Sequence, residues 1–72
     1  MPNPETVFKL ETDFIELFKL LKLTGLCESG GSAKHSVAGS LVKVDGNVET
    51  RKACKIRRGQ SVDFQGHTIR VE

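Results

Sequence analysis

The chain has 72 residues, of which 38% are hydrophobic and 28% are charged, so it has room for one small hydrophobic core but not for a catalytic domain beside a recognition domain. This composition is typical of a globular protein and not of a disordered one. The formal net charge is only +2, yet residues 31–60 carry seven bases and two acids, against three bases and five acids in residues 1–30, so the basic part is the middle of the chain.

The start of the chain, Met1-Pro2-Asn3-Pro4-Glu5, has neither the basic nor the apolar region of a targeting signal, and no apolar run exceeds two residues. We therefore expect a frayed start, no membrane insertion and a cytoplasmic location. Cys27 and Cys54 are expected to be buried thiols. A disulfide between them is the alternative, which nothing else in the sequence favours.

The N-terminal third predicts one short strand and one helix. Apolar and charged residues alternate over 7–11, which favours an edge strand. The sequence Asp-Phe-Ile-Glu at 13–16 fits a capping box, so a helix is expected to start there, and Gly25 is expected to end it. The apolar face of this helix, at spacings of three and four, contains Phe14, Leu17, Phe18 and Leu21.

A second, shorter helix is expected after a break at 29–32. Gly39 closes this helix, whose apolar residues at spacings of four are Ala33, Val37 and Leu41. The pair Asp45-Gly46 between the runs 42–44 and 47–48 predicts a hairpin, because its turn needs positive φ angles that Asp-Gly adopts at low cost.

The segment 49–59 is expected to be a basic loop with a short extended stretch around Cys54 and Ile56. A second hairpin is predicted through Gln65-Gly66-His67, with His67 in the turn; its strands contain Val62 and Phe64 on one side, and Ile69 and Val71 on the other. The expected fold class is α+β, with two helices packed on a small antiparallel sheet of hairpins in a single domain spanning residues 1–72.

Several short pieces of sequence, in a fixed order, resemble a known family. They are Gly25-Leu26, Ser29, Ala33, Val42-Lys43-Val44-Asp45-Gly46 and Gly59-Gln60-Ser61-Val62. Together they resemble the S-four-type RNA-binding domain, named after ribosomal small-subunit protein four, with the family core at residues 17–64. The resemblance implies an αL-type motif, in which two helices lead into a small sheet and bind structured RNA.

A further set of pieces looks closer to short stand-alone bacterial members of the YbcJ type. It comprises Ser29-Gly30-Gly31, Ala33-Lys34, the run 42–46, Val48-Glu49-Thr50-Arg51-Lys52 and Lys55-Ile56. The chain also departs from the wider family, which usually has Arg at the position of Gly30 and Arg-Leu-Asp at positions 16–18. There are three other departures. Ser36 replaces a large aliphatic residue, Ser40 replaces a Gly, and Gln60 replaces an acid.

RNA offers a line of phosphates, which small domains neutralise with Lys and Arg side chains. The segment 51–58 has five bases in eight residues, and Lys34 and Lys43 are expected beside it if the second helix and the first hairpin pack together. The alternative is a solvated basic loop that keeps the protein in solution. The candidate RNA-binding residues are Ser29, Gly30, Gly31, Lys34, His35, Lys43, Arg51, Lys52, Lys55, Arg57 and Arg58.

The pair Gly30-Gly31 at a helix start offers a second way to hold a phosphate, because unhindered backbone N–H groups at the positive end of a helix can approach it closely. Lys34, one turn along, would add its charge. The alternative is a plain interhelical turn that needs flexible residues. The spacing of a nucleotide P-loop, G-x-x-x-x-G-K-[ST], is absent from the sequence.

Recognition of bases has less support in the sequence, which contains no Tyr or Trp. The four Phe residues, at positions 8, 14, 18 and 64, all lie in apolar patterns typical of a core. We therefore expect the protein to recognise RNA by its shape and backbone geometry.

Neither catalysis nor metal binding is indicated. Ser36, His35 and Asp45 are catalytic residue types, but so short a chain offers little cleft from which water could be excluded. The two His and two Cys residues lack the close spacing of zinc ligands. The sequence thus predicts a non-enzymatic protein without a metal or a cofactor.

The predicted partner is structured RNA, ribosomal or otherwise folded, bound by a monomer. Two alternatives remain open. In one, the basic loop docks on an acidic protein and RNA affinity is incidental. In the other, the chain is a subunit that lends RNA affinity to a separately encoded RNA-modifying enzyme.

Overall fold

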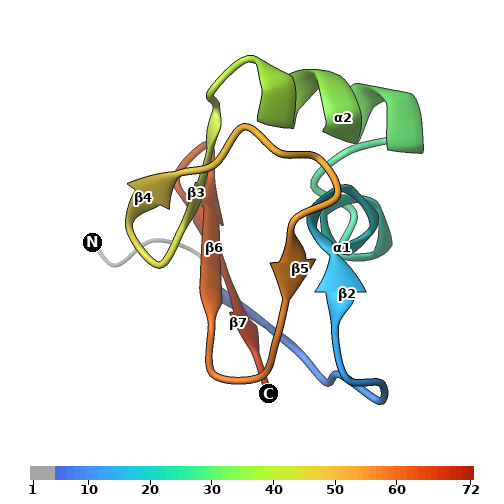
Figure 1. Cartoon of the computed structure of the whole chain (residues 1–72), viewed down its shortest axis with the longest axis vertical. Coiled ribbons are helices and arrows are strands. Elements are labelled where there is room, and N and C mark those ends of the chain that lie inside the picture. The colour runs from blue at the N-terminus through green and yellow to red at the C-terminus, as the bar shows by residue number, and fades with distance from the viewer. Residues whose placement is uncertain (1–4) are drawn as a thin grey trace.

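A computed structural model describes residues 5–72 of the chain, and Figure 1 shows two helices beside a sheet. The helices are α1, Leu17–Leu23, and α2, Gly30–Ala38. The strands are β1 Glu5–Phe8, β2 Ile15–Glu16, β3 Val42–Val44, β4 Asn47–Val48, β5 Lys55–Ile56, β6 Ser61–Phe64 and β7 His67–Val71. The predicted α+β class is confirmed. The expected frayed start includes Glu5, which instead lies in β1, and residues 1–4, which are outside the described part.

Five strands form one sheet in the order β1-β7-β6-β3-β4. The neighbours from β7 to β4 are antiparallel, but β1 runs parallel to β7, with Phe8 beside Val71. The sheet is therefore mixed, and the expectation of a purely antiparallel sheet is wrong at this edge. The reason is that β1 and β7 come from opposite ends of the described chain, so no hairpin joins them. The predicted edge strand is present, shifted to residues 5–8.

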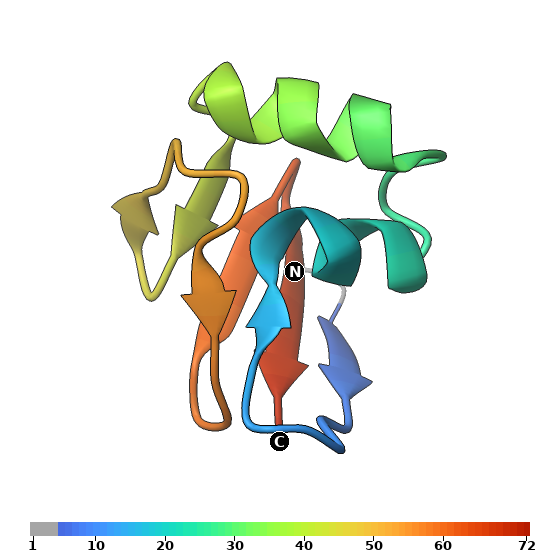
Figure 2. The ribbon, with the colours of Figure 1, turned by 45° about the vertical axis from the view of Figure 1, so that its right-hand side comes forward.

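β2 and β5 form a separate two-stranded ribbon. Figure 2 shows this ribbon in front of the sheet, with α1 directly above it and α2 crossing the top of the molecule. The core fills the space between the sheet and this second layer, and its fully buried side chains include Leu17, Leu20, Leu21, Val37, Val42, Ile56, Val62 and Ile69.

α1 starts at Leu17 and not at the predicted capping box 13–16, which is a correction. Glu16 precedes the helix without any capping hydrogen bond from its side chain. The backbone carbonyls of Cys54 and Lys52 accept hydrogen bonds from the N–H groups of Leu17 (2.9 Å) and Phe18 (3.1 Å) instead. The basic loop thus satisfies the first free N–H groups of the helix, and β2 occupies the residues just before it.

Both helices end in a residue with positive φ. Gly25 has φ +81° after α1, as predicted. α2 ends at Ala38 with Gly39 as its C-cap, as predicted, and the left-handed residue that follows is Ser40, with φ +63°. Ser40 N donates to the Val37 carbonyl and Leu41 N to the Ser36 carbonyl, which is the Schellman pattern. Leu41 therefore lies beyond the helix and is exposed, so its predicted place on the apolar face is wrong.

Both predicted hairpins are confirmed, and each turn uses two residues with positive φ. Asp45 and Gly46 have φ +51° and +86°, and Gln65 and Gly66 have φ +50° and +78°. Such primed turns match the right-handed twist of the strands that they join. His67 is the first residue of β7, paired with Phe64 on β6, and not a turn residue; its Nε2 atom lies 3.1 Å from Thr6 Oγ1 on the neighbouring strand β1.

Candidate nucleic-acid interface

The ribbon β2–β5 places an aromatic ring beside two basic side chains. Its register pairs Ile15 with Ile56 and Glu16 with Lys55. Continued by one residue, this register sets Phe14 opposite Arg57. Because side chains alternate between the two faces of a strand, Lys55 and Arg57 point outward while Ile56 is fully buried.

The distances around the Phe14 ring are those of cation–π contacts. The Lys55 ammonium nitrogen lies 4.9 Å from the ring centroid and the Arg57 guanidinium carbon lies 5.9 Å from it. Phe14 is 37% exposed, so the prediction that it belongs to the core is wrong. Phe64 is buried as predicted, and Phe8 and Phe18 are partly buried against the core.

A second ring with basic neighbours lies where the two helices meet. The Lys34 ammonium nitrogen of α2 is 4.7 Å from the Phe18 ring centroid on α1, and the Lys19 nitrogen is 5.9 Å from it. Lys19 also pairs with Glu16 at 3.1 Å. Since the Phe18 N–H bonds to the Lys52 carbonyl, Phe18 connects the helices to the basic loop.

Arg51 is held by Glu49. The Arg51 Nε and Nη2 atoms donate to the two carboxylate oxygens at 3.0 and 3.1 Å, and its backbone N–H donates at 2.9 Å. These hydrogen bonds from Arg51 lower the pKa of Glu49 to about 2, so the carboxylate is ionised at neutral pH. The Arg51 side chain is nevertheless 77% exposed, and its guanidinium remains within reach of an incoming phosphate.

An open pocket lies between Arg51 and Lys55, with Ala53 and Cys54 as its other lining residues. Cys54 is a free thiol that is only half-buried, so the expectation of two buried thiols holds for Cys27 alone. Burial, together with the nearby Glu49 carboxylate, raises the pKa of Cys54. The thiol is therefore protonated at neutral pH and adds no negative charge to the pocket.

Two of the predicted basic residues do not join this group. Lys43 points away from the helices, because Val42 and Val44 on either side of it are buried in the core. Its cross-strand neighbour on β6 is Asp63. Arg58 donates from Nη2 to the Leu10 carbonyl at 2.6 Å, which ties the segment after β1 to the end of the basic loop.

The start of α2 has the predicted residues in three different roles. The Ser29 hydroxyl oxygen caps the helix by accepting from Ser32 N at 3.1 Å. The N–H groups of Gly30 and Gly31 have no acceptor among residues 5–72, so both remain available. His35 is exposed and lies one residue, about 100° around the helix, beyond Lys34; it does not share the side that faces Phe18.

The pieces 45–46 and 59–61 that carried the resemblance form a structural clamp. The Asp45 carboxylate accepts from Ser61 N at 2.9 Å and from Gln60 Nε2 at 3.1 Å. Gln60 Oε1 in turn accepts from the backbone N–H of Arg57 at 2.7 Å. The hydrogen bonds from Ser61 and Gln60 lower the pKa of Asp45. This chain of contacts fixes the first hairpin turn to the end of the basic loop, and so positions Arg57.

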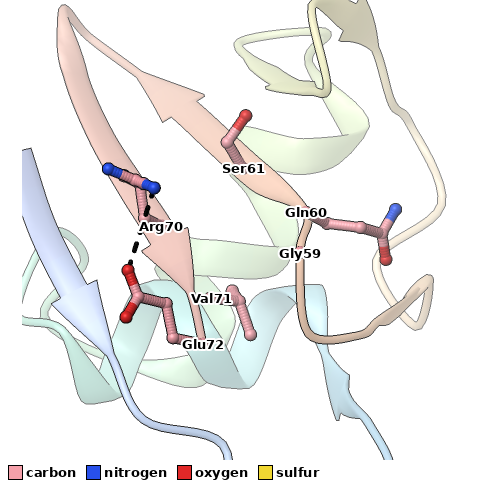
Figure 3. A pocket seen from close by; sticks show the side chains of 6 residues that line it. All are labelled: Gly59, Gln60, Ser61, Arg70, Val71 and Glu72. Atoms are coloured by element: carbon pink, nitrogen blue, oxygen red, sulfur yellow. Dashed lines mark ion pairs between the residues drawn. The ribbon is translucent and has the colours of Figure 1, made fainter.

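A second pocket lies where β6 begins and β7 ends. It is lined by Gly59, Gln60, Ser61, Arg70, Val71 and Glu72 (Figure 3). Arg70 and Glu72 turn toward one another along β7, with 3.9 Å between their charged atoms, while Gln60 points the other way. Because Arg70 also meets Glu5 at 3.4 Å, acids already balance the charge of this pocket, and it offers no free cation.

Within residues 5–72, no three side chains of His, Cys, Asp or Glu gather as they would around a metal ion. Over the same residues, neither helix is long and apolar enough to cross a membrane.

The sequence therefore anticipated most cations of this surface, but it assigned Phe14 and Phe18 to the core and gave no role to Lys19, which lies beside the Phe18 ring. A signal for Phe14 was present in the alternation at 14–17, where Phe14 and Glu16 share one face and Ile15 and Leu17 the other. The helical spacing from Phe14 to Leu21 concealed this short strand pattern.

Comparisons with known proteins agree with one another. A family model described as S4 domain matches residues 8–72. The YbcJ proteins of Escherichia coli (strain K12) and Shigella flexneri are each 58% identical over 57 residues, which is 79% of this chain and 81% of theirs. The name of the Escherichia coli relative proposes RNA binding for that protein.

The fold also has a solved counterpart. The solution structure of YbcJ from Escherichia coli superposes with a TM-score of 0.72 at 52% identity, covering 92% of this chain and 85% of that one. That structure is described as revealing an ALFAL motif involved in RNA binding. This chain belongs to the S4 domain family and is a YbcJ-like member of it.

Proposed function

We propose that this chain is a non-enzymatic RNA-binding protein of the cytoplasm that holds folded RNA by its phosphates, with ribosomal RNA as the first candidate. The observation that carries the proposal is the clustering of exposed cations from α2 and the basic loop around two partly exposed rings. We call this surface the basic face: Phe14, Phe18, Gly30, Gly31, Lys34, Arg51, Lys52, Lys55 and Arg57.

The arrangement of the basic face suits a polyanion. Lys34, Lys55 and Arg57 form no ion pair with any acid among residues 5–72, so their charges are available to phosphates. Each phosphate that such a side chain neutralises releases condensed counterions, which favours binding. The free N–H groups of Gly30 and Gly31 add donors at the positive end of a nine-residue helix.

Three predicted contacts are less favoured by this geometry. Ser29 is occupied as a helix cap, Arg58 is bonded to a backbone carbonyl, and Lys43 lies on the opposite face of the sheet. His35 is exposed next to Lys34, at the margin of the basic face. The proposal therefore gives the central role to Lys55 and Arg57, which lie on the same side of the chain because the buried Ile56 is between them.

The test is a fluorescence-anisotropy titration of a folded ribosomal RNA fragment and an unstructured RNA of equal length at physiological salt. The double variant Lys55→Ser/Arg57→Ser is compared with Lys9→Ser/Lys43→Ser, which removes the same charge outside the basic face: Lys43 lies on the outer face of the sheet, and Lys9 is an exposed residue directly after β1. We expect the wild type to prefer the folded RNA and the first variant to bind about tenfold more weakly or worse, with little change in the control.

Negligible binding of the wild type at physiological salt would overturn the proposal. In that case the partner would be sought among acidic proteins, and a partner that co-purifies after nuclease treatment would identify the protein-interaction alternative. A role beside the ribosome, or beside a separately encoded RNA-modifying enzyme, is an extension of the same proposal. It requires the same RNA contacts.

A further inference from the structure

We infer that Phe14 is a stacking site for one unpaired RNA base, with Lys55 and Arg57 holding the phosphates on either side of that nucleotide. This inference rests on the proposed function and adds to it a class of RNA: a folded RNA with a bulged or looped-out nucleotide. It replaces the expectation, drawn from the sequence, that recognition uses shape and backbone geometry alone.

The first argument is the position of the ring relative to the core. Three of the four Phe residues are in the core or packed against it. Phe14 is neither, and 37% of it is exposed even with two basic side chains beside its ring. The Phe14 side chain therefore lies outside the core cluster with over a third of its surface open, so its ring is available as a contact surface for another molecule.

The second argument is that the ring is held in place. The β2–β5 ribbon begins at the very next residue, and the fully buried Ile56 anchors its other strand. The Phe14 carbonyl accepts a hydrogen bond from the Thr12 hydroxyl at 2.8 Å. On the facing strand, the Arg57 N–H is bonded to Gln60. A ring on a fixed backbone loses little entropy when a base stacks on it.

The third argument is the chemistry beside the ring. Stacking on an aromatic ring tolerates any base because every base has a π face, and it is usually combined with cations that follow the backbone. Lys55 and Arg57 lie within 6 Å of the ring centroid by the distances given above. Both are long, exposed side chains, so they can swing from the ring to the phosphates as the base arrives.

An aromatic ring with two cations fits a nucleotide better than an acidic peptide. Carboxylates would engage Lys55 and Arg57 but would leave the Phe14 ring in water. A nucleotide offers a planar base for the ring and a phosphate on each side for the cations, so it satisfies all three side chains at once.

The experiment uses two RNA stems of the same sequence, one fully paired and one with a single bulged 2-aminopurine, a fluorescent base whose emission falls when it stacks. Affinities are measured by anisotropy for the wild type and for Phe14→Leu and Phe14→Trp. Phe8→Leu is the matched control, since it also removes a Phe ring but lies on β1. Circular dichroism verifies that each variant is folded.

We expect the wild type to bind the bulged stem roughly tenfold more tightly than the paired stem, with quenching of the 2-aminopurine. Phe14→Leu should abolish this preference and the quenching while changing the affinity for the paired stem less than about twofold, because stacking contributes nothing there. Phe14→Trp should retain both the preference and the quenching, and so should Phe8→Leu.

The inference is overturned if the wild type shows no preference, or if Phe14→Leu weakens binding to both stems equally. Binding to the paired stem separates these outcomes from a failure of the proposed function. If that binding persists and is lost in the Lys55→Ser/Arg57→Ser variant, only the stacking site is refuted. If neither stem binds to the wild type, the proposed function falls together with the inference.

Discussion

Glu49 accepts hydrogen bonds from the guanidinium of Arg51 and so competes with phosphates for this side chain of the basic face. The carboxylate receives three hydrogen bonds from Arg51 and remains ionised at neutral pH, since its pKa is about 2. A phosphate that approaches Arg51 must therefore displace Glu49 or bind beside its negative charge. Among the predicted basic residues, Arg51 is the one whose contribution depends most on a neighbour.

The variant Glu49→Gln should accordingly bind RNA more tightly, by several-fold at low salt, because it frees Arg51 and removes a negative charge from the basic face. It should cost little stability, because Arg51 is exposed and water screens its attraction to Glu49. Glu5→Gln is the control, since it removes the same charge from the outer face. Equal gains in anisotropy titrations of both variants would mean that net charge alone is responsible.

Ser40 adopts a backbone conformation that suits glycine. Its φ of +63° lies in the left-handed region, where side chains other than Gly, Asn and Asp are disfavoured. It also follows a helix in a Schellman pattern, where Gly is the usual residue. The preference of the wider family for Gly at position 40 therefore has a physical reason. Ser at this position makes the fold slightly less stable.

Ser40→Gly should therefore raise the free energy of unfolding by about 0.5–1 kcal/mol, measured by urea denaturation. Ser36→Gly, within α2, should lower it by about 0.5–1 kcal/mol, since Gly is unfavourable inside a helix. If both variants were destabilised to the same extent, the positive φ of Ser40 would not reduce the stability of the wild type.

Among the elements, the β2–β5 ribbon is the one that builds the basic face. Each of its strands has only two residues, so the hydrogen bonds between them cannot hold it alone. Ile56 is fully buried and packs in the common core, and the carbonyls of Cys54 and Lys52 are fixed to the start of α1. Core packing and helix capping together hold the basic loop in its position.

Truncation of the anchor should show this dependence. Ile56→Ala should lower the free energy of unfolding by about 2–5 kcal/mol, against about 0.5–1.5 kcal/mol for Ile56→Val, which keeps most of the buried volume. The valine variant should still bind RNA with the wild-type affinity. Thermal denaturation of the two variants compares them directly, and equal losses would show that the ribbon is not anchored through this side chain.

The start of α2 offers a second element-scale test. A Cβ atom at Gly31 would meet only the Ser29 hydroxyl, at 3.9 Å, so Gly31→Leu should fold and be at least as stable as the wild type. It should weaken RNA binding about threefold or more, because a side chain there obstructs the free N–H groups at the helix start. Ala38→Leu at the other end of α2 is the control. Unchanged affinity of the Gly31 variant would exclude a phosphate at this helix end.

The elements that the sequence predicted correctly are those with local causes. Asp45-Gly46 and Gln65-Gly66 form their turns because these residues tolerate positive φ, and Gly25 ends α1 for the same reason. The start of α1 was missed because its cap comes from carbonyls more than thirty residues later in the chain. Local spacing could not show that competing contact, and it also placed Phe14 on a helix that does not include it.

At the scale of the whole molecule, the fold separates two surfaces. The outer face of the sheet carries charges beside their opposites, such as Arg70 with Glu5, whereas the basic face presents cations that acids of the described chain leave largely unpaired. The sequence shows how many basic residues there are but not on which surface each one lies. Lys34 and Lys43 carry the same charge, and only the fold distinguishes them. Strand alternation sends Lys43 to one side, and the helix contact holds Lys34 over Phe18 on the other.

The salt dependence of RNA binding tests this division most directly. The logarithm of the affinity for a folded RNA is plotted against the logarithm of the salt concentration for the wild type and the two equally charged double variants. The slope should become shallower by about two for Lys55→Ser/Arg57→Ser, one for each lost phosphate contact, and should not change for Lys9→Ser/Lys43→Ser. Equal slopes in the two variants would contradict the account, because binding would then depend on net charge and not on the basic face.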